Sequence, residues 1–377
     1  TRYYVCFAAA LASAIGVAFA GNMFTLFLFY EALTLSTYPL VTHSGTEEAR
    51  RAGRTYLGIL LSTSIVLQLF AILWTWVEAG TLDFQMGGIL AGAVSERTAA
   101  VLLVLYMFGI GKAALMPLHG WLPAAMVAPT PVSALLHAVA VVKAGVFTVL
   151  KVIVYIFGID FLRGMAGSEW LIAVASTTIV IASLIALRQD DLKRRLAYST
   201  VSQLSYVVLG GALATSAGVV GGAMHIATHA FGKITLFFCA GAIYTAAHKR
   251  LVSELDGIGY RMPVTMGAFA VGALGLIGLP PFAALWSKWY LVAGADEGSH
   301  IAVIAVLLGS SLLNALYFVP ILVRAFFPAS GMPVTPGRAE APWPILAATL
   351  VAALGTAALF FYPQALLTLV EPLGAIR

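Results

Sequence analysis

The chain has 377 residues, of which 61% are apolar and only 10% are charged, with a formal net charge of +5. Soluble domains carry about 25% charged residues, so this composition excludes an ordinary soluble fold and indicates a protein whose solvent is the lipid bilayer. The 36 glycines and 16 prolines fit a helical bundle, in which neighbouring helices satisfy interrupted backbones. The sequence therefore predicts an all-α, polytopic membrane helix bundle.

The excess of basic residues does not indicate nucleic-acid binding, and the cysteines do not indicate a metal cluster. The basic residues sit mainly in short loops between apolar segments, where membrane topology accounts for them. Cys6 and Cys239 lie within apolar segments and lack C-x-x-C spacing, so we expect no disulfide, zinc or iron–sulfur site. The sequence predicts no cofactor and no nucleic-acid partner.

Hydropathy predicts about eleven membrane-spanning helices in a single transmembrane domain, residues 1–377. In chain order the spans are 3–20, 23–42, 55–78, 98–126, 131–158, 169–187, 196–213, 217–247, 264–293, 300–327 and 343–368. With an odd number of spans, the two ends lie on opposite sides. The chain begins at Thr1 with neither a methionine nor a cleavage signal, so we expect its start to be missing.

The loop charges predict the orientation. One set of loops holds Arg2, Arg50, Arg51, Arg54, Arg188, Lys193, Arg194, Arg195, Lys249, Arg250, Arg261, Arg324 and Arg338. The other set holds only Arg97, Arg163 and Arg377. Because lysine and arginine concentrate in cytoplasmic loops, we expect a multi-pass protein of the cell inner (plasma) membrane, with its N-terminus cytoplasmic and its C-terminus outside.

Two of the predicted helices carry prolines in their interiors, which interrupt the hydrogen-bond ladder. These are Pro117 and Pro123 in GKAALMPLHGWLP, and Pro280 and Pro281 in GLPPFAALWSK. Each helix also carries a lysine, Lys112 before its break and Lys288 after it. The two helices are five spans apart and so run in opposite directions, which indicates an inverted repeat with the transport site at the broken helices. Two ordinary proline kinks are the alternative.

Glu31 and several lysines lie inside predicted spans, where a charge costs about 2.5 to 3.5 kcal/mol and usually marks an ion pathway. For Glu31 we predict Lys112 as the counter-ion; a static pair that only fixes helix packing is the alternative. Apolar burial destabilises the charged form of a lysine, so Lys112, Lys143, Lys233 and Lys288 are candidates for proton exchange near neutral pH. Lys151, closer to a helix end, is expected to reach the interface instead.

The segment HIATHAFGKITLFF places His225, His229 and Lys233 at i, i+4 and i+8, which gives one polar stripe on a helix. Histidine titrates near neutrality, which suits a proton relay. A zinc site is the alternative. Ile226, however, occupies the position of the glutamate in H-E-x-x-H, and the sequence offers no evident third ligand.

His119 and His137 are accessory candidates. His119 follows the first proline break, where unwound backbone gives access to water. His137 and Lys143 lie six residues apart, about 120° around a helix, and are expected to contact different neighbours. Packing through a hydrogen bond is the alternative for both histidines. The polar residues Ser199, Thr200, Ser202, Gln203 and Ser205 predict either interhelical packing or the lining of a water wire.

Five motifs carry a family resemblance: FYEALTLSTYPL, GKAALMPLHGWLPAAMVAPTPVSALLHA, DDLKRRLAYSTVSQLSY, HIATHAFGKITLFF and GLIGLPPFAALWSKWYL. In this order they resemble the antiporter-like subunits of respiratory complex I and Mrp-type Na+/H+ antiporters. The resemblance implies a core of fourteen helices with about three N-terminal ones missing here. It also implies two inverted five-helix repeats, 1–158 and 169–327, followed by a final helix, 343–368.

The resemblance also implies roles for the buried ionisable residues. Glu31 and Lys112 resemble the family's glutamate–lysine pair, Lys143 its second-helix lysine, His229 and Lys233 its central relay, and Lys288 its terminal lysine. A lysine at 288 argues against the M-type subunit of complex I. The absence of a long helical extension after the last predicted span argues against the L-type and Mrp A-type subunits, so the D-type Mrp protein fits best.

The sequence thus predicts a proton-translocating subunit of a multisubunit monovalent cation/proton antiporter. Its expected partners are protons, Na+ in an antiporter, other membrane subunits and the bilayer. The alternatives are a proton-pumping subunit of NADH:quinone oxidoreductase, where it would be part of an enzyme, or of a membrane-bound hydrogenase. A structural membrane subunit without its own ion path and a quinone-binding enzyme are further alternatives.

Overall fold

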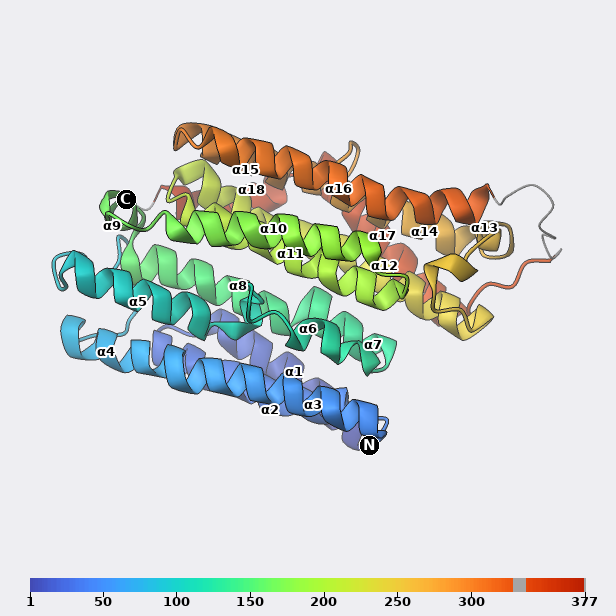
Figure 1. The fold of residues 1–377 in the computed structure, drawn as a ribbon, viewed down its shortest axis with the longest axis horizontal. Helices are drawn as coiled ribbons and strands as arrows, with labels where there is room; N and C mark the ends of the chain where they lie inside the picture. Colours follow the sequence, from blue (N-terminus) through green and yellow to red (C-terminus); the bar gives the residue numbers. More distant parts are fainter. Residues whose placement is uncertain (328–336, 376–377) are drawn as a thin grey trace.

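Long helices lie side by side along most of the chain and form one elongated bundle (Figure 1). The computed structural model describes residues 1–327 and 337–375. This part is 80% helical and contains no strands. Eight helical stretches in it are long and apolar enough to cross a membrane. The prediction of an all-α polytopic membrane protein is confirmed.

The helices keep the order that hydropathy predicts. The first half contains α1 (Arg2–Phe19), α2 (Met23–Val41), α3 (Glu47–Ser62), α4 (Leu69–Ala79), α5 (Glu96–Gly109), α6 (Trp121–Ala124), α7 (Thr130–Ala134), α8 (Val141–Lys151) and α9 (Ile159–Gly164). The second half contains α10 (Trp170–Arg188), α11 (Leu192–Ala212), α12 (Ser216–Ala247), α13 (Ile258–Arg261), α14 (Pro263–Ile277), α15 (Ala284–Glu297), α16 (Ile301–Phe326), α17 (Trp343–Phe361) and α18 (Gln364–Gly374).

Short irregular helical turns join several of these helices. They are η1 (Thr63–Gln68), η2 (Gly111–Ala113), η3 (Ala125–Val127), η4 (Leu135–Val139), η5 (Val152–Phe157) and η6 (Val252–Glu254). Three of them, η1, η4 and η5, are π-helical and extend membrane helices. The predicted spans 98–126, 196–213 and 264–293 correspond to α5 with α6, to α11, and to α14 with α15.

Two predicted boundaries are wrong. The third helix begins at Glu47, capped by Thr46, and not near residue 55, because its first turns are an arginine-rich extension that hydropathy does not register. The last predicted helix, 343–368, is divided into α17 and α18 between Phe361 and Gln364, at Pro363. Arg377, which the charge pattern assigned to the outer side, lies outside the described residues.

The first broken helix opens earlier than its prolines suggest. α5 ends at Gly109, and regular α-helix resumes only at Trp121. Two glycines allow the backbone to approach the third span closely: a Cβ on Gly109 would lie 2.5 Å from the Gln68 nitrogen, and one on Gly111 would lie 2.3 Å from Thr63 Oγ1. The prediction that Lys112 precedes the break is therefore wrong, because Lys112 lies within it, in η2.

The second broken helix separates α14 from α15 and follows its prolines. α14 ends at Ile277, Gly278 adopts a left-handed φ of 94°, and α15 starts at Ala284. Pro280 and Pro281 have no N–H to donate, so they remove the i+4 hydrogen bonds from the carbonyls of the last turn of α14. The prediction that Lys288 follows this break is correct.

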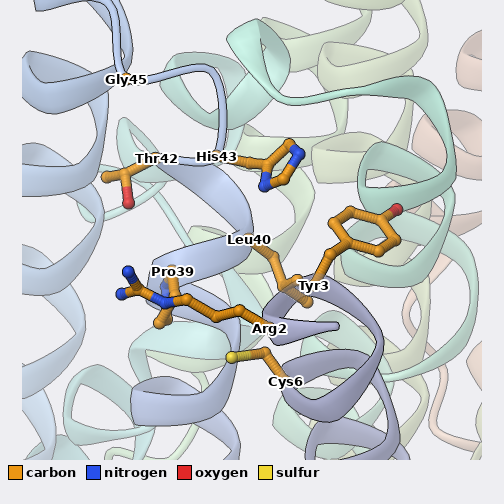
Figure 2. A pocket seen from close by; sticks show the side chains of 8 residues that line it. All are labelled: Arg2, Tyr3, Cys6, Pro39, Leu40, Thr42, His43 and Gly45. Atoms are coloured by element: carbon orange, nitrogen blue, oxygen red, sulfur yellow. The ribbon is translucent and has the colours of Figure 1, made fainter.

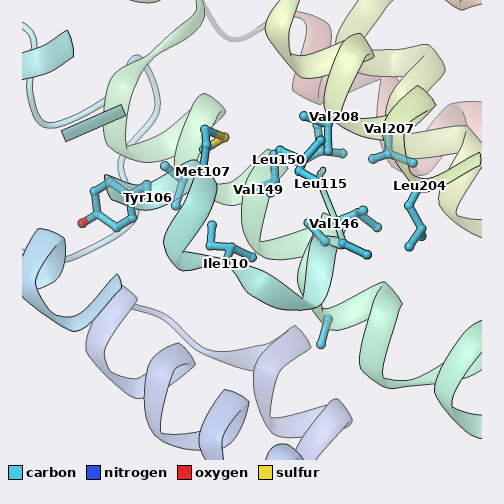
Figure 3. Packing of buried hydrophobic residues seen from close by; sticks show 14 of the residues in the cluster. Tyr106, Met107, Ile110, Leu115, Val146, Val149, Leu150, Leu204, Val207 and Val208 are labelled. Carbon is cyan, nitrogen blue, oxygen red and sulfur yellow. The ribbon is translucent and has the colours of Figure 1, made fainter. Parts of the chain in front are cut away.

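The core around the first break is apolar and closely packed. Figure 3 shows side chains of α5, of the break that follows it, of α8 and of α11 meeting there; the labelled residues are Tyr106, Met107, Ile110, Leu115, Val146, Val149, Leu150, Leu204, Val207 and Val208. A Cβ on Gly145 of α8 would lie 2.4 Å from the carbonyl carbon of Lys112, so this helix packs directly on the lysine's backbone. The core thus fixes the break in position.

Candidate functional site

The ammonium group of Lys112 is held by α2. Its Nζ donates to the Tyr30 carbonyl at 2.7 Å and to Thr34 Oγ1 at 2.6 Å, and it lies 3.1 Å from the centroid of the Tyr30 ring. The Tyr30 hydroxyl accepts from the Lys112 backbone nitrogen at 3.1 Å. Lys112 is fully buried. Hydroxyl, carbonyl and aromatic face replace the water that this cation loses.

The predicted contact between Glu31 and Lys112 is wrong for this structure. The pair is absent from the salt bridges of the described residues, and both carboxylate oxygens of Glu31 are buried without a hydrogen-bond partner. Glu31 nevertheless follows Tyr30 directly on α2 and precedes Thr34 by three residues. The lysine is bound by the neighbours of the glutamate, because a backbone carbonyl and a hydroxyl there satisfy two of its three donors.

Lys143 links the first half of the chain to the second. Its Nζ lies 2.6 Å from Nδ1 of His229, which belongs to α12. Lys143 is 7% exposed and His229 fully buried. This contact brings together two predicted site residues that are 86 positions apart. Because each group can hold a proton, a proton can pass between them without solvent.

His225 continues the polar stripe along α12. Its ring centroid lies 5.8 Å from that of His229, its Nδ1 lies 2.8 Å from Ser287 Oγ, and its Nε2 lies 3.0 Å from Gln203 Oε1. Ser287 precedes Lys288 in α15. The predicted stripe of His225, His229 and Lys233 therefore exists, and its first histidine reaches the second broken helix.

Lys233, the third member of the stripe, is fully buried. Its Nζ donates to the Leu196 carbonyl at 3.0 Å and to Ser199 Oγ at 2.7 Å, both on α11. Of the polar residues predicted on this helix, Ser199 and Gln203 thus contact site residues. The other three bind elsewhere: Ser202 lies 2.9 Å from Ser183, and Thr200 and Ser205 donate to carbonyls of their own helix.

Lys288 binds the end of the helix that precedes the second break. Its Nζ donates to the carbonyls of Leu276 and Ile277 at 2.9 and 2.8 Å and to Ser311 Oγ of α16 at 3.0 Å. Pro280 and Pro281 are the i+4 residues of these two carbonyls, so the lysine supplies the donors that the prolines remove. The cation also faces the negative end of the helix dipole of α14.

The accessory histidines occupy different surroundings. His137 lies in η4, fully buried, with its ring centroid 5.2 Å from that of Phe237 and no hydrogen bond to either ring nitrogen. As predicted, it does not share the partner of Lys143. His119 lies inside the first break with its ring 6.1 Å from that of Tyr198, and its Nδ1 is unpaired. Buried unpaired polar atoms of this kind are where proteins usually bind internal water.

Lys151 lies apart from the line of buried lysines. Its Nζ lies 4.2 Å from the ring centroid of Phe84 and 4.7 Å from that of Tyr155, and the side chain is partly exposed. The helix continues past it as η5. Aromatic faces therefore stabilise this cation near the edge of the bundle.

One cavity lies apart from the buried lysines. The cavity in Figure 2 has a volume of 230 Å³ and lies at the start of α1 and the end of α2. Its lining residues are Arg2, Tyr3, Cys6, Pro39, Leu40, Thr42, His43 and Gly45. None of them is a predicted site residue. Residues 1–327 and 337–375 also hold no group of three His, Cys, Asp or Glu side chains that could bind a metal.

Several residues that hold the lysines were missed from sequence. Tyr30 and Thr34 bind Lys112, Ser311 binds Lys288, and Ser287 binds His225. Thr34 had a usable signal, because it lies one helical turn from Glu31 in an otherwise apolar segment. Ser311 had none, because only tertiary packing brings α16 beside α15.

Comparison with known proteins gives a consistent result. The family model described as NADH:quinone oxidoreductase/Mrp antiporter, TM matches residues 20–314. The NADH-quinone oxidoreductase subunit N of Desulforudis audaxviator is 35% identical over 350 residues, which cover 91% of this chain and 68% of that protein. The subunit L of Rickettsia conorii is 36% identical over 317 residues, and the match covers 81% of this chain and 46% of that protein.

Two solved structures share the fold over almost the whole chain. One is the membrane-bound sulfane sulfur reductase, an archaeal respiratory membrane complex, with a TM-score of 0.86, 29% identity, and coverage of 99% of this chain and 75% of that one. The other is the Mrp complex from Dietzia sp. DQ12-45-1b, with a TM-score of 0.86, 26% identity, and coverage of 97% and 76%. The chain thus belongs to the antiporter-like membrane subunit family shared by NADH:quinone oxidoreductase and Mrp antiporters.

Proposed function

We propose that this chain translocates protons through the membrane along its buried lysines and histidines. The observation that carries the proposal is the contact of 2.6 Å between Lys143 Nζ and His229 Nδ1, since it joins ionisable groups of the two halves inside an apolar bundle. Buried ionisable residues in membrane helices are costly and mark ion pathways. A purely structural role would be met more simply by apolar packing.

The proposed path runs from Glu31 and Lys112 through Lys143 to His229, and from there through His225 or Lys233 to Lys288. Each lysine is bound mainly by carbonyls, hydroxyls or a histidine, and none is fixed in a salt bridge of the described residues. A change in charge at one site alters the proton affinity of the next. His119 and His137 are assigned to the path as accessory groups.

The same proposal includes an arrangement of two inverted repeats, 1–158 and 169–327, followed by the helix predicted at 343–368. A broken helix in each range supports this arrangement, with Lys112 inside the first break and Lys288 in the helix that follows the second. The charge pattern of the loops supports a cytoplasmic N-terminus in the cell inner membrane.

The carried ions and the surrounding machine also belong to the proposal. An Mrp-type antiporter would exchange protons for Na+, whereas a redox complex would pump protons by electron transfer. The relatives named as NADH-quinone oxidoreductase subunits N and L support the redox complex, and the Dietzia Mrp complex supports the antiporter. Purification from native membranes discriminates between them, because flavin and iron–sulfur subunits accompany the chain only in a redox pump.

The direct test replaces Lys143 by methionine, which keeps most of the side-chain volume and removes the ammonium group. In liposomes containing the purified protein with its native partners, a potassium diffusion potential drives protons inward, and a trapped dye reports internal pH. We expect the Lys143→Met variant to lose at least about tenfold in rate, since proton-transfer groups contribute about 10²- to 10⁴-fold.

Lys151→Met is the matched control. It removes a lysine eight residues further along, whose cation faces aromatic rings and not the proposed path. Its transport rate should equal that of the parent protein. Equal rates for Lys143→Met and Lys151→Met would refute the proposed path.

A further inference from the structure

Trp121 begins the helix that follows the first break, and its side chain reaches back across the break. The indole Nε1 donates to the carbonyl of Gly111 at 3.0 Å, ten residues earlier in the chain. Gly111 is the first residue of the short turn η2, and Lys112 is the next. Trp121 and Lys112 are both fully buried. One side chain therefore connects the two ends of the interruption directly beside the lysine.

The hydrogen bond from Trp121 acts on the peptide unit that leads into Lys112. A trans peptide unit is planar, and its C=O and N–H groups point to opposite sides. In this unit the Gly111 carbonyl accepts from Trp121, and the Lys112 N–H donates to the Tyr30 hydroxyl at 3.1 Å. Trp121 and Tyr30 thus hold the two edges of one peptide plane. A rotation of the plane would break both hydrogen bonds.

The backbone of the break gives this plane little other support. Regular α-helix ends at Gly109 and resumes at Trp121, and η2 between them is a single 3-10 turn followed by Ala114 with a left-handed φ of 56°. The Gly111 carbonyl also accepts from the Ala114 N–H at 3.0 Å, but that bond lies within the same turn. Only groups outside the turn can fix its orientation relative to the neighbouring helices, and in a membrane these groups must come from protein or bound water.

The indole of Trp121 is itself held by α3. The ring of Tyr56 lies edge-on to it, with ring centroids 5.5 Å apart and ring planes at 74°. Both side chains are fully buried. Edge-to-face contacts have a preferred geometry, so the Tyr56 ring favours one orientation of the indole. The N–H that binds Gly111 is therefore directed by a rigid neighbour.

The orientation of this peptide plane determines where the ammonium group of Lys112 lies. The Lys112 Cα belongs to the plane, and its Nζ binds the Tyr30 carbonyl at 2.7 Å and Thr34 Oγ1 at 2.6 Å. Glu31 lies between these two residues in the sequence of α2, and both of its carboxylate oxygens are unpaired. A shift of the Lys112 backbone would change which of these acceptors the cation reaches.

We propose that Trp121 is a positioning residue for proton transfer, which holds the peptide of Lys112 so that the ammonium group reaches Tyr30 and Thr34. This inference rests on the proposed function, because it assumes that Lys112 lies on the proton path. Trp121 does not carry the proton, since the indole N–H is a donor only. With the backbone held in this way, a movement of the cation toward Glu31 involves the lysine side chain alone.

The test compares Trp121→Phe with Trp286→Phe in the liposome assay. Both variants keep an aromatic ring and remove an indole N–H that donates to a backbone carbonyl at 3.0 Å, but Trp286 binds Phe360 in the second half of the chain. We expect Trp121→Phe to lower the transport rate about two- to tenfold, the range that one hydrogen bond supports. Trp286→Phe measures the loss caused by such a deletion away from Lys112.

Combination with Thr34→Val separates positioning from a general loss of stability. If Trp121 acts through the contact between Lys112 and Thr34, Trp121→Phe should slow the Thr34→Val protein less than it slows the parent protein, by under about twofold. Trp286→Phe should slow both proteins by the same factor. A parent-like rate for Trp121→Phe, or equal factors for Trp121→Phe in the two proteins, would overturn the inference.

Tyr30→Phe is a second variant, which gives the answer if Trp121→Phe does not fold. It removes the hydroxyl on the other edge of the peptide plane and keeps the ring and the carbonyl that face the ammonium group. It should slow the parent protein and, like Trp121→Phe, slow the Thr34→Val protein by a smaller factor. Equal factors would again contradict a role of the peptide plane.

Lys112→Met distinguishes a failure of this inference from a failure of the proposed function. If Lys112→Met loses transport while Trp121→Phe and Thr34→Val act as independent factors, only the role of Trp121 is wrong. If Lys112→Met transports at the parent rate, the proposed path through Lys112 is wrong, and the role of Trp121 is wrong as well.

Discussion

The two broken helices hold their lysines in different ways. In the first, Lys112 lies within the break and its ammonium group binds another helix, through the Tyr30 carbonyl and the Thr34 hydroxyl. In the second, Lys288 follows the break and turns back onto the helix it follows, where it binds the carbonyls of Leu276 and Ile277. Lys112 therefore connects two spans, whereas Lys288 supplies hydrogen-bond donors to the end of a single broken one.

This difference has a consequence for mobility. The acceptors of Lys112 also have partners within α2, since Thr34 Oγ1 donates to the Tyr30 carbonyl at 3.3 Å. If Lys112 moves toward Glu31, it leaves no carbonyl without a donor. If Lys288 leaves, two buried carbonyls lose theirs, because prolines occupy the i+4 positions. We infer that Lys112 is the more easily moved of the two charges.

The largest expected effect separates the two lysines by stability. Lys288→Met leaves two buried acceptors unpaired, so we expect the free energy of unfolding to fall by about 2 to 4 kcal/mol. Lys112→Met leaves no carbonyl without a donor and removes a buried charge, so the free energy of unfolding should fall by less than about 1 kcal/mol. Unfolding in one detergent, followed by tryptophan fluorescence, measures both. Adding Pro280→Ala and Pro281→Ala to Lys288→Met restores backbone donors and should recover part of the loss.

A smaller effect is expected at the binding point of Lys112 on α2. Thr34→Val keeps the side-chain shape and removes the hydroxyl that lies 2.6 Å from Nζ. A hydrogen bond to a charged group contributes about 1.5 to 3 kcal/mol, so we expect transport in the liposome assay to change by about tenfold or more. Thr37→Val is the control, since it breaks a 2.6 Å contact with Tyr56 and touches no lysine. Equal rates for the two variants would contradict a special role for Thr34.

The smallest effect is expected at Ser311. Ser311→Ala removes one of three acceptors of Lys288 and leaves both carbonyls in place. We therefore expect a two- to threefold change in transport, about 0.5 kcal/mol, and no measurable loss of stability. Ser13→Ala, whose hydroxyl donates only within α1, serves as the control. A loss as large as that of Lys288→Met would show that the carbonyls of α14 are not the main partners of this lysine.

The sequence was a good guide to which residues matter and a poor one to their contacts. It identified the line of buried ionisable residues and the stripe on α12, since both depend on composition and helical spacing. The sequence predicted a pair of Lys112 with Glu31. In the structure, Lys112 instead binds Tyr30, one residue before Glu31, and Thr34, three residues after it. The prolines at 280 and 281 could have predicted which carbonyls need a donor, but not that Lys288 supplies it.

By itself, the sequence determined the membrane class, the order of the spans, the two interruptions and the presence of charges inside them. Hydropathy and proline chemistry act over one or two helical turns, so they can be read without a partner. Only the tertiary structure decided that Lys143 meets His229, that Lys112 binds α2, and that α16 reaches Lys233 through Ser199. These contacts join residues from 34 to 118 positions apart. They depend on how whole helices pack, and no local pattern specifies that packing.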